Sequence, residues 1–141
     1  MKIIAIVALL VVAFAASALA QPTISGPLSG VFGPGEYIVT GDLRIEHGER
    51  LVLLPGTTFL FNGPYLLTVG RERTLICEGT ESDSIKFMPN YDAGVTQGGS
   101  LTFSMTGSDD ILSYCHFSDG YTEYNGGGVA IYNSIPTIRH C

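Results

Sequence analysis

The feature that most restricts the fold of this chain is a long succession of short β-type runs, each closed within a few residues by a turn. Residues 37–40 end at Gly41, and residues 57–61 end at Asn62. About eleven such runs follow one another, and none carries apolar residues at helical spacing over a useful length. Strands this short suit two all-β architectures: a sandwich or barrel, and a solenoid in which successive turns of chain stack strand on strand.

An internal similarity favours the solenoid. The pattern aliphatic-x-x-Cys runs from Leu112 to Cys115 and again from Ile138 to Cys141, an offset of 26 residues, and a glycine-rich segment opens a strand before each copy. This offset is a normal length for one turn of a β-solenoid. Parallel strands stack about 4.8 Å apart, so equivalent inward side chains lie over one another. We therefore expect Leu112 beneath Ile138 and Cys115 beneath Cys141, and we expect the glycines before these strands to supply a positive φ.

Several segments have sequences typical of one family. They are GEYIVTGDL (35–43), LPGTTF (54–59), EGTESDSIKF (78–87), LSYC (112–115) and SIPTIRHC (134–141). On these segments the chain resembles the secreted right-handed parallel β-helix repeat proteins of bacteria, over roughly residues 35–141. The resemblance implies an all-β, right-handed parallel β-helix in a secreted or surface-associated protein. It says little about function, because these motifs are structural positions of the coil.

The first 20 residues have the organisation of a signal peptide. Lys2 gives a short basic region, residues 3–16 are almost wholly apolar, and residues 18–20 form a signal-peptidase pattern, with Gln21 as the first mature residue. The alternative is a membrane anchor, but the apolar run is shorter than the roughly 20 residues that span a bilayer. We therefore expect a protein that is secreted or held at the outer cell surface, with no transmembrane segment after cleavage.

The mature chain is expected to have two parts. Residues 21–35 are rich in Pro and Gly and form a leader or N-terminal cap, and residues 36–141 form the coils of the solenoid. The pattern stops at Cys141 in the middle of a coil, without the terminal cap that a solenoid needs. We therefore expect a solenoid that is incomplete at the C-terminus and has an open strand edge there.

Charge and cysteine content disfavour some functions and leave others open. The chain carries 7 Lys and Arg against 13 Asp and Glu, a formal net charge of −6. Nucleic acids and anionic membranes are disfavoured as partners, since both need clustered basic charge. The three cysteines, Cys77, Cys115 and Cys141, have no metal-knuckle spacing. Export permits disulfides, but an odd count leaves one thiol unpaired, and we favour buried thiols over a bridge.

No catalytic, cofactor-binding or metal-binding residue is assigned. The histidines are scattered without ligand spacing, Gly-x-Ser-x-Gly is missing, and the glycine run at 126–128 lacks the Lys-Ser/Thr of a phosphate loop. The remaining candidate is an acidic and aromatic surface patch that suits a sugar or a cation, formed by Asp109, Asp110, Asp119, Tyr121 and Glu123. The alternative is a turn for the first two residues and a solvated loop for the others.

Two functions remain. The first is a scaffold for binding or adhesion whose partner is an extracellular glycan or a surface protein, and its basis is a repetitive scaffold without identifiable chemistry. The second is a polysaccharide lyase or hydrolase whose catalytic residues lie mostly beyond Cys141, and it rests on the use of this fold by such enzymes. A lyase that acts on a polyuronate needs a base and cations, and no basic cluster is visible in the sequence. The sequence therefore favours the scaffold.

Overall fold

The computed structural model describes residues 20–123 and 127–141, and its regular structure is β-strand apart from one short 3₁₀ helix, η1 (Tyr91–Ala93). The predicted signal peptide lies outside the described residues except for Ala20. Within the described ranges, no helix is long and apolar enough to cross a membrane. The strands are β1 (Thr23–Leu28), β2 (Gly30–Phe32), β3 (Gly35–Ile45), β4 (Arg50–Leu53), β5 (Thr57–Phe61), β6 (Leu66–Val69), β7 (Thr74–Glu78), β8 (Ile85–Pro89), β9 (Ser100–Ser104), β10 (Ile111–Ser113), β11 (Cys115–Phe117), β12 (Val129–Tyr132) and β13 (Thr137–Arg139).

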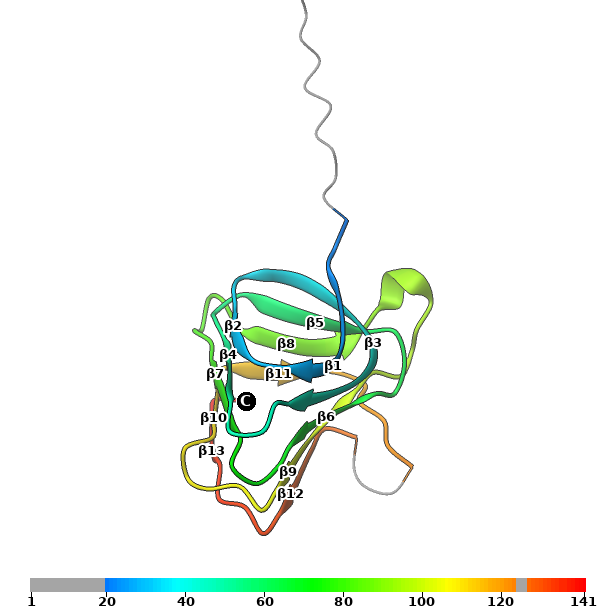
Figure 1. Ribbon diagram of the computed structural model, residues 1–141. Helices are drawn as coiled ribbons and strands as arrows, with labels where there is room; N and C mark the ends of the chain where they lie inside the picture. The colour runs from blue at the N-terminus through cyan, green and yellow to red at the C-terminus, as the bar shows by residue number, and fades with distance from the viewer. Residues whose placement is uncertain (1–19, 124–126) are drawn as a thin grey trace, which may run out of the picture.

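The strands form two sheets, and the pairings within them are parallel. The large sheet has the order β11-β8-β5-β3-β6-β9-β12, with β1 beside β3, and the small sheet has the order β13-β10-β7-β4-β2. The large sheet is curled, because the first half of β3 pairs with β5 and its second half pairs with β6. The small sheet lies across the open side of this curl (Figure 1).

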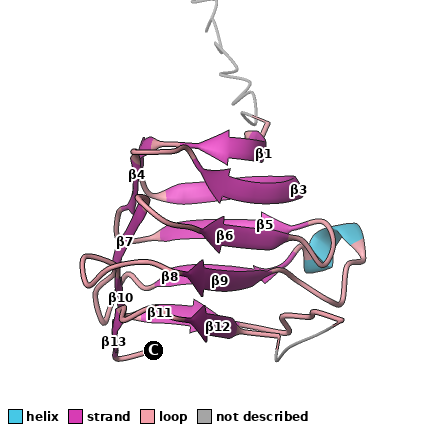
Figure 2. Ribbon diagram, turned by 60° about the horizontal axis from the view of Figure 1, so that its bottom comes forward, coloured by secondary structure: helices cyan, strands magenta, loops and turns pink. Residues whose placement is uncertain are grey.

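The chain contributes strands to both sheets in turn. Each such turn of chain forms one level, and Figure 2 shows the levels stacked on one another. The levels are β1–β2, β3–β4, β5–β7, β8–β10 and β11–β13. The predicted all-β fold with parallel stacking is confirmed, and the arrangement is compatible with a solenoid-like fold. The strands divide between two sheets, and the right-handed β-helix itself stays a prediction.

Columns of apolar side chains fill the space between the sheets. In the small sheet, one column consists of register partners from successive levels, namely Leu53, Cys77, Leu112 and Ile138. The predicted position of Leu112 beneath Ile138 is therefore confirmed. The first three of these side chains are at most 1 % exposed, so the stacking of levels places each of them in a continuous core.

An aromatic column lies on the other side of this core. Phe59 meets Phe87 edge to face with 5.7 Å between ring centroids, and Phe87 stacks on Phe117 at 4.7 Å. Burying one such side chain contributes about 1.5–3 kcal/mol, and a well-oriented aromatic pair adds about 0.5–1.5 kcal/mol. Equivalent residues of three levels thus stabilise the stack through direct contact along its axis.

The segment predicted as a leader or N-terminal cap contains two strands. Strand β1 pairs with β3, and β2 pairs with β4. Residues 21–35 therefore contribute the first level of the stack, although their Pro and Gly content conceals the strands in the sequence.

The glycine before β9 is required for close packing and not for a left-handed backbone. Neither Gly98 nor Gly99 has a positive φ, so the expected conformational role is wrong at this corner. A Cβ at Gly99 would lie 2.2 Å from the Phe61 ring and 2.5 Å from the Tyr65 carbonyl oxygen. The chain passes so near its neighbours that only glycine fits.

Candidate binding groove

The five residues of the predicted acidic and aromatic patch do not lie together. Asp110 is only 1 % exposed, and its Oδ1 accepts a hydrogen bond from the Leu75 backbone N–H at 2.8 Å. Burial raises the pKa of this carboxyl above its ordinary value. Asp110 therefore attaches β7 to the turn before β10, and Asp109 lies exposed in that turn. The positions of Asp109 and Asp110 both fit a role in a turn, which is the alternative to the surface patch.

Asp119 lies at a second place. Its carboxylate accepts a hydrogen bond from the Tyr91 hydroxyl, and this bond raises the pKa of Tyr91. The contact joins η1 to the loop after β11. Tyr91 also lines a small cavity of about 150 Å³ together with Glu36 and Asp92.

Tyr121 and Glu123 do line a shared cavity. It has a volume of about 260 Å³, and it is also lined by Asp42, Pro64, Leu66 and Thr122. Of the predicted patch, these two residues are therefore the ones that the structure brings to a common concave surface.

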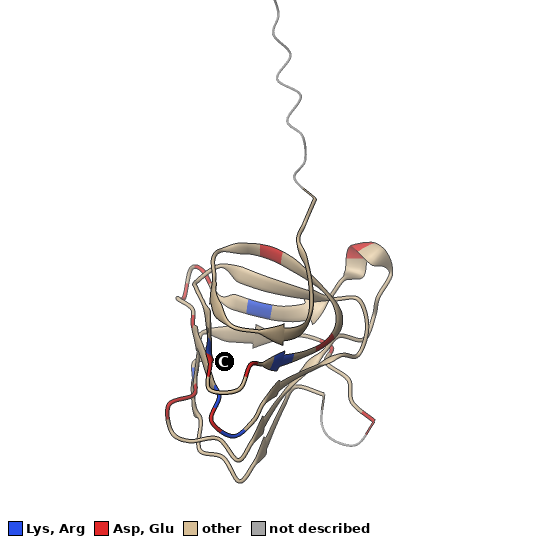
Figure 3. Cartoon of the chain, in the orientation of Figure 1, with Lys and Arg blue, Asp and Glu red and all other residues tan. Residues whose placement is uncertain are grey.

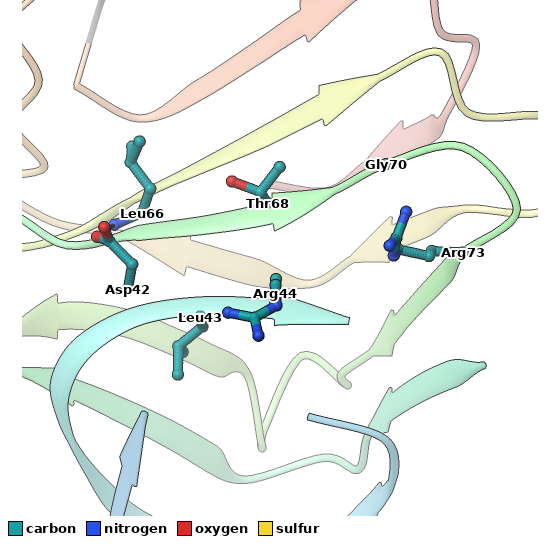
Figure 4. Close-up of a pocket in the computed structure, with 7 residues that line it drawn as sticks. All are labelled: Asp42, Leu43, Arg44, Leu66, Thr68, Gly70 and Arg73. Carbon is teal, nitrogen blue, oxygen red and sulfur yellow. Dashed lines mark hydrogen bonds between the residues drawn. The ribbon is translucent and has the colours of Figure 1, made fainter. Parts of the chain in front are cut away.

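This cavity is adjacent to a larger one, and Asp42 and Leu66 line both. The larger cavity has a volume of about 340 Å³ and lies where β3 pairs with β6. We call the two together the β3–β6 groove. The larger part is lined by Asp42, Leu43, Arg44, Leu66, Thr68, Gly70 and Arg73 (Figure 4).

The alternation of side chains along β3 explains why charged groups reach this groove. Successive residues of a strand point to opposite faces. Leu43 and Ile45 are buried in the core at 1 % and 0 % exposure, so Asp42 and Arg44 face outward. Thr68 of β6 pairs directly with Arg44 and brings a hydroxyl to the same face.

Backbone hydrogen bonds fix two of the charged groups in the groove. The Arg73 Nε donates to the Ile45 carbonyl at 2.6 Å, and its Nη1 donates to the Arg71 carbonyl at 3.1 Å. The Asp42 Oδ1 accepts from the Leu66 backbone N–H at 2.9 Å. Because these bonds restrain the side chains before any ligand arrives, less conformational entropy is lost on binding.

The groove has two chemically different ends. Arg44 and Arg73 supply cationic donors at one end, and Arg44 lies between Asp42 and Arg73 along the groove (Figure 4). Tyr121 and Glu123 supply an aromatic surface and a carboxylate at the other end. Elsewhere the basic positions are few among the acidic ones (Figure 3). The arrangement suits a polar, extended ligand that offers hydroxyl groups and apolar ring faces.

The basic part of this groove is not apparent from the sequence. Arg44 and Arg73 are far apart in the chain and form no cluster in the sequence, but pairing of β3 with β6 brings them to one cavity. The sequence does contain a signal for the proximity of Arg44 and Arg73. Polar residues alternate with apolar ones at 42–45, and adding the length of one coil to these positions leads to the residues of the next level that lie beside them.

The histidines and cysteines give no metal centre. In the part of the chain that the structure describes, no group of three or more His, Cys, Asp or Glu residues could hold a metal ion. The His47 Nε2 lies 3.0 Å from the Glu72 carboxylate at an exposed position, and His140 stacks on Tyr114 with 4.6 Å between ring centroids. His116 is exposed on β11.

Comparisons of the chain with protein-family models, with curated proteins and with solved structures gave no match.

Proposed function

We propose that this chain is an exported right-handed parallel β-helix scaffold that binds an extracellular carbohydrate along the β3–β6 groove. The observation that carries the proposal is the adjacency of two cavities that share Asp42 and Leu66 on the outer side of a curled sheet. The larger cavity, about 340 Å³, lies within the range of small-molecule sites. An elongated groove accommodates consecutive units of a linear chain.

The chemistry of the lining supports a sugar ligand. Carboxylate oxygens of Asp42 and Glu123 accept hydrogen bonds from hydroxyl groups, and Arg44 and Arg73 donate to hydroxyl or carboxylate oxygens. The Tyr121 ring is 39 % exposed, so its face is accessible to the apolar face of a pyranose.

A second candidate is a polysaccharide lyase or hydrolase. The observation in its favour is the pair Arg44 and Arg73, which can offset the charge of a substrate carboxylate. A binding scaffold remains the better supported function, because Asp42, the carboxylate that lines this cavity, is already engaged by the Leu66 backbone N–H.

Titration calorimetry with neutral and with uronate oligosaccharides tests the binding proposal. Arg44→Ala and Tyr121→Ala should each weaken binding at least about tenfold, which corresponds to about 1.4 kcal/mol. Lys86→Ala, an exposed cation on β8 that does not line the groove, is the matched control and should leave the affinity unchanged. An equal loss in all three variants, or no binding of either ligand class, would contradict the proposal.

Two further measurements separate the alternatives. The purified protein is assayed for release of unsaturated uronides with and without calcium. Release would show that the protein is a lyase and would contradict the binding-scaffold proposal. N-terminal sequencing of the protein recovered outside the producing cells should begin at Gln21, because the predicted signal peptide ends at residue 20. An uncleaved N-terminus would argue for the membrane anchor.

A further inference from the structure

The three cysteines lie close to one another, although Cys77 is the register partner of Leu112 and Cys115 that of Ile85. Cys77 belongs to β7, Cys115 begins β11, and Cys141 follows β13. The Cys115 thiol lies near enough to influence the pKa values of both Cys77 and Cys141. The Cys115 Sγ also donates to the Cys77 carbonyl at 3.6 Å, and the Cys141 Sγ donates to the Leu112 carbonyl at 3.6 Å.

The strand register brings Cys115 and Cys141 directly above one another. Ser113 is paired with Arg139, and the Tyr114 backbone N–H donates to the Arg139 carbonyl at 3.2 Å. The next side chains, Tyr114 and His140, are stacked. Continuing the same register makes Cys115 and Cys141 partners on adjacent parallel strands, which are about 4.8 Å apart. That spacing lies within the Cα separations that a disulfide spans.

The surroundings of the three thiols differ in a way that separates their roles. Cys77 is 0 % exposed, and burial raises its pKa well above the ordinary value. A hydrogen bond from the Cys77 thiol is the largest influence on Cys115 and lowers its pKa, whereas burial raises the pKa of Cys141. Cys141 is the exposed member. The expectation of three buried thiols is therefore correct for Cys77 and Cys115 and wrong for Cys141.

We propose that Cys115 and Cys141 form a thiol–disulfide exchange site that reacts with a small-molecule disulfide of the glutathione type. The Cys141 thiolate attacks one sulfur of the small disulfide, forms a mixed disulfide and releases the other half, which takes up the proton that Cys141 lost. The Cys115 thiolate then attacks the Cys141 Sγ, closes the intramolecular bond and releases the second half as a thiol. Two protein thiols become one disulfide, and one small disulfide becomes two thiols.

The bond would attach the segment that follows β13 to the start of β11. All three residues of β13 are exposed, and the strand pairs only with β10 among the described strands. A covalent link beside that pairing restricts the unfolded chain and opposes local opening of β13. The inference does not depend on the β3–β6 groove, which contains none of the three cysteines.

Trypsin provides a clean test, because its sites at Arg73, Lys86 and Arg139 put the three cysteines in three different peptides. The purified chain is incubated with oxidised glutathione, alkylated without reductant, digested and analysed by mass spectrometry. The expected product joins the peptide of residues 87–139 to the peptide that begins at His140, while the peptide of residues 74–86 carries an alkylated Cys77. Amide exchange in β13 should also slow by on the order of tenfold on oxidation.

Two variants make the outcome specific. Cys141→Ser should leave Cys115 reduced after the same treatment, whereas Cys77→Ala should still form the link between Cys115 and Cys141. A link between Cys77 and Cys115, or a protein that stops at the mixed disulfide on Cys141, would overturn the proposal. Retention of all three free thiols at saturating oxidised glutathione would overturn it as well.

Discussion

The level formed by β8–β10 and the level formed by β11–β13 have equivalent strands but different environments. Leu112 and Ile138 are register partners, yet Leu112 is 0 % exposed and Ile138 is 41 % exposed. Phe103 and Ile131 show the same contrast, at 0 % and 46 %. The residue types are alike in both levels, so burial in this fold comes from being covered on both sides. A single position in the repeat does not determine how much a side chain stabilises the protein.

Truncation of the paired residues should give the largest difference between the two levels. We expect Leu112→Ala to lower the free energy of unfolding by about 2–5 kcal/mol, because it leaves a cavity in a covered column. Ile138→Ala should lower it by less than about 1 kcal/mol, since that side chain already contacts water. Urea denaturation of both variants measures the difference, and equal losses would show that the last level is as well packed as the one beneath it.

Adding a methyl group to a closely packed glycine, Gly99, and to an open one, Gly128, should give a smaller difference in stability loss. The packed position should again lose more. Gly99→Ala should cost about 1–3 kcal/mol, because the new Cβ would overlap the Phe61 ring. Gly128→Ala, before β12, should change stability by less than about 0.5 kcal/mol, since a Cβ there would have nothing within 4 Å. Thermal unfolding of the two variants tests this, and a melting temperature for Gly99→Ala equal to that of the unmodified protein would contradict the packing role of the glycine.

Asp110 connects the level β8–β10 to the level β11–β13. Its titration should therefore change the free energy of unfolding with pH. Its side chain accepts from the Leu75 N–H, and its carbonyl accepts from the Thr137 N–H at 2.9 Å. Burial raises its folded-state pKa above the unfolded value of about 3.9. The favourable contribution is therefore complete below that unfolded value and is lost as the pH rises through the folded pKa.

Asp110→Asn keeps a carbonyl acceptor and removes the charge. The stability of the unmodified protein relative to this variant should fall as the pH is raised from about 4. Chemical denaturation of both proteins across a pH series measures the effect. A difference that stays constant with pH, or one that grows in favour of the aspartate, would mean that burial does not dominate this carboxyl.

The smallest effect should come from the ion pair between Arg139 of β13 and Glu78 of β7. The Arg139 Nη2 lies 4.0 Å from the Glu78 Oε1, and both side chains are more than half exposed. Glu78→Gln should therefore cost at most about 0.5 kcal/mol, and the cost should disappear in high salt. A loss that persists in molar salt would indicate a contact other than this ion pair.

The candidate site was only partly predictable. Tyr121 and Glu123 were predicted to belong to a patch, and they do line the groove. Asp110 shares the acidic character of the candidate patch, but a backbone N–H of another level holds its side chain in the interior. Arg44 is not apparent as a site residue in the sequence, because Arg73, which lines the same cavity, comes from a different level.

The sequence by itself determined the all-β composition, the turns between short runs and the alignment of Leu112 with Ile138. These are local properties or consequences of the repeat, and strand periodicity expresses them directly. The tertiary structure decided the strands hidden in the Pro/Gly-rich segment, the division into two sheets, the exposure of Cys141 and the union of the two cavities into one groove. Each of these depends on which residue lies on the adjacent level, and that information is spread over distant parts of the chain.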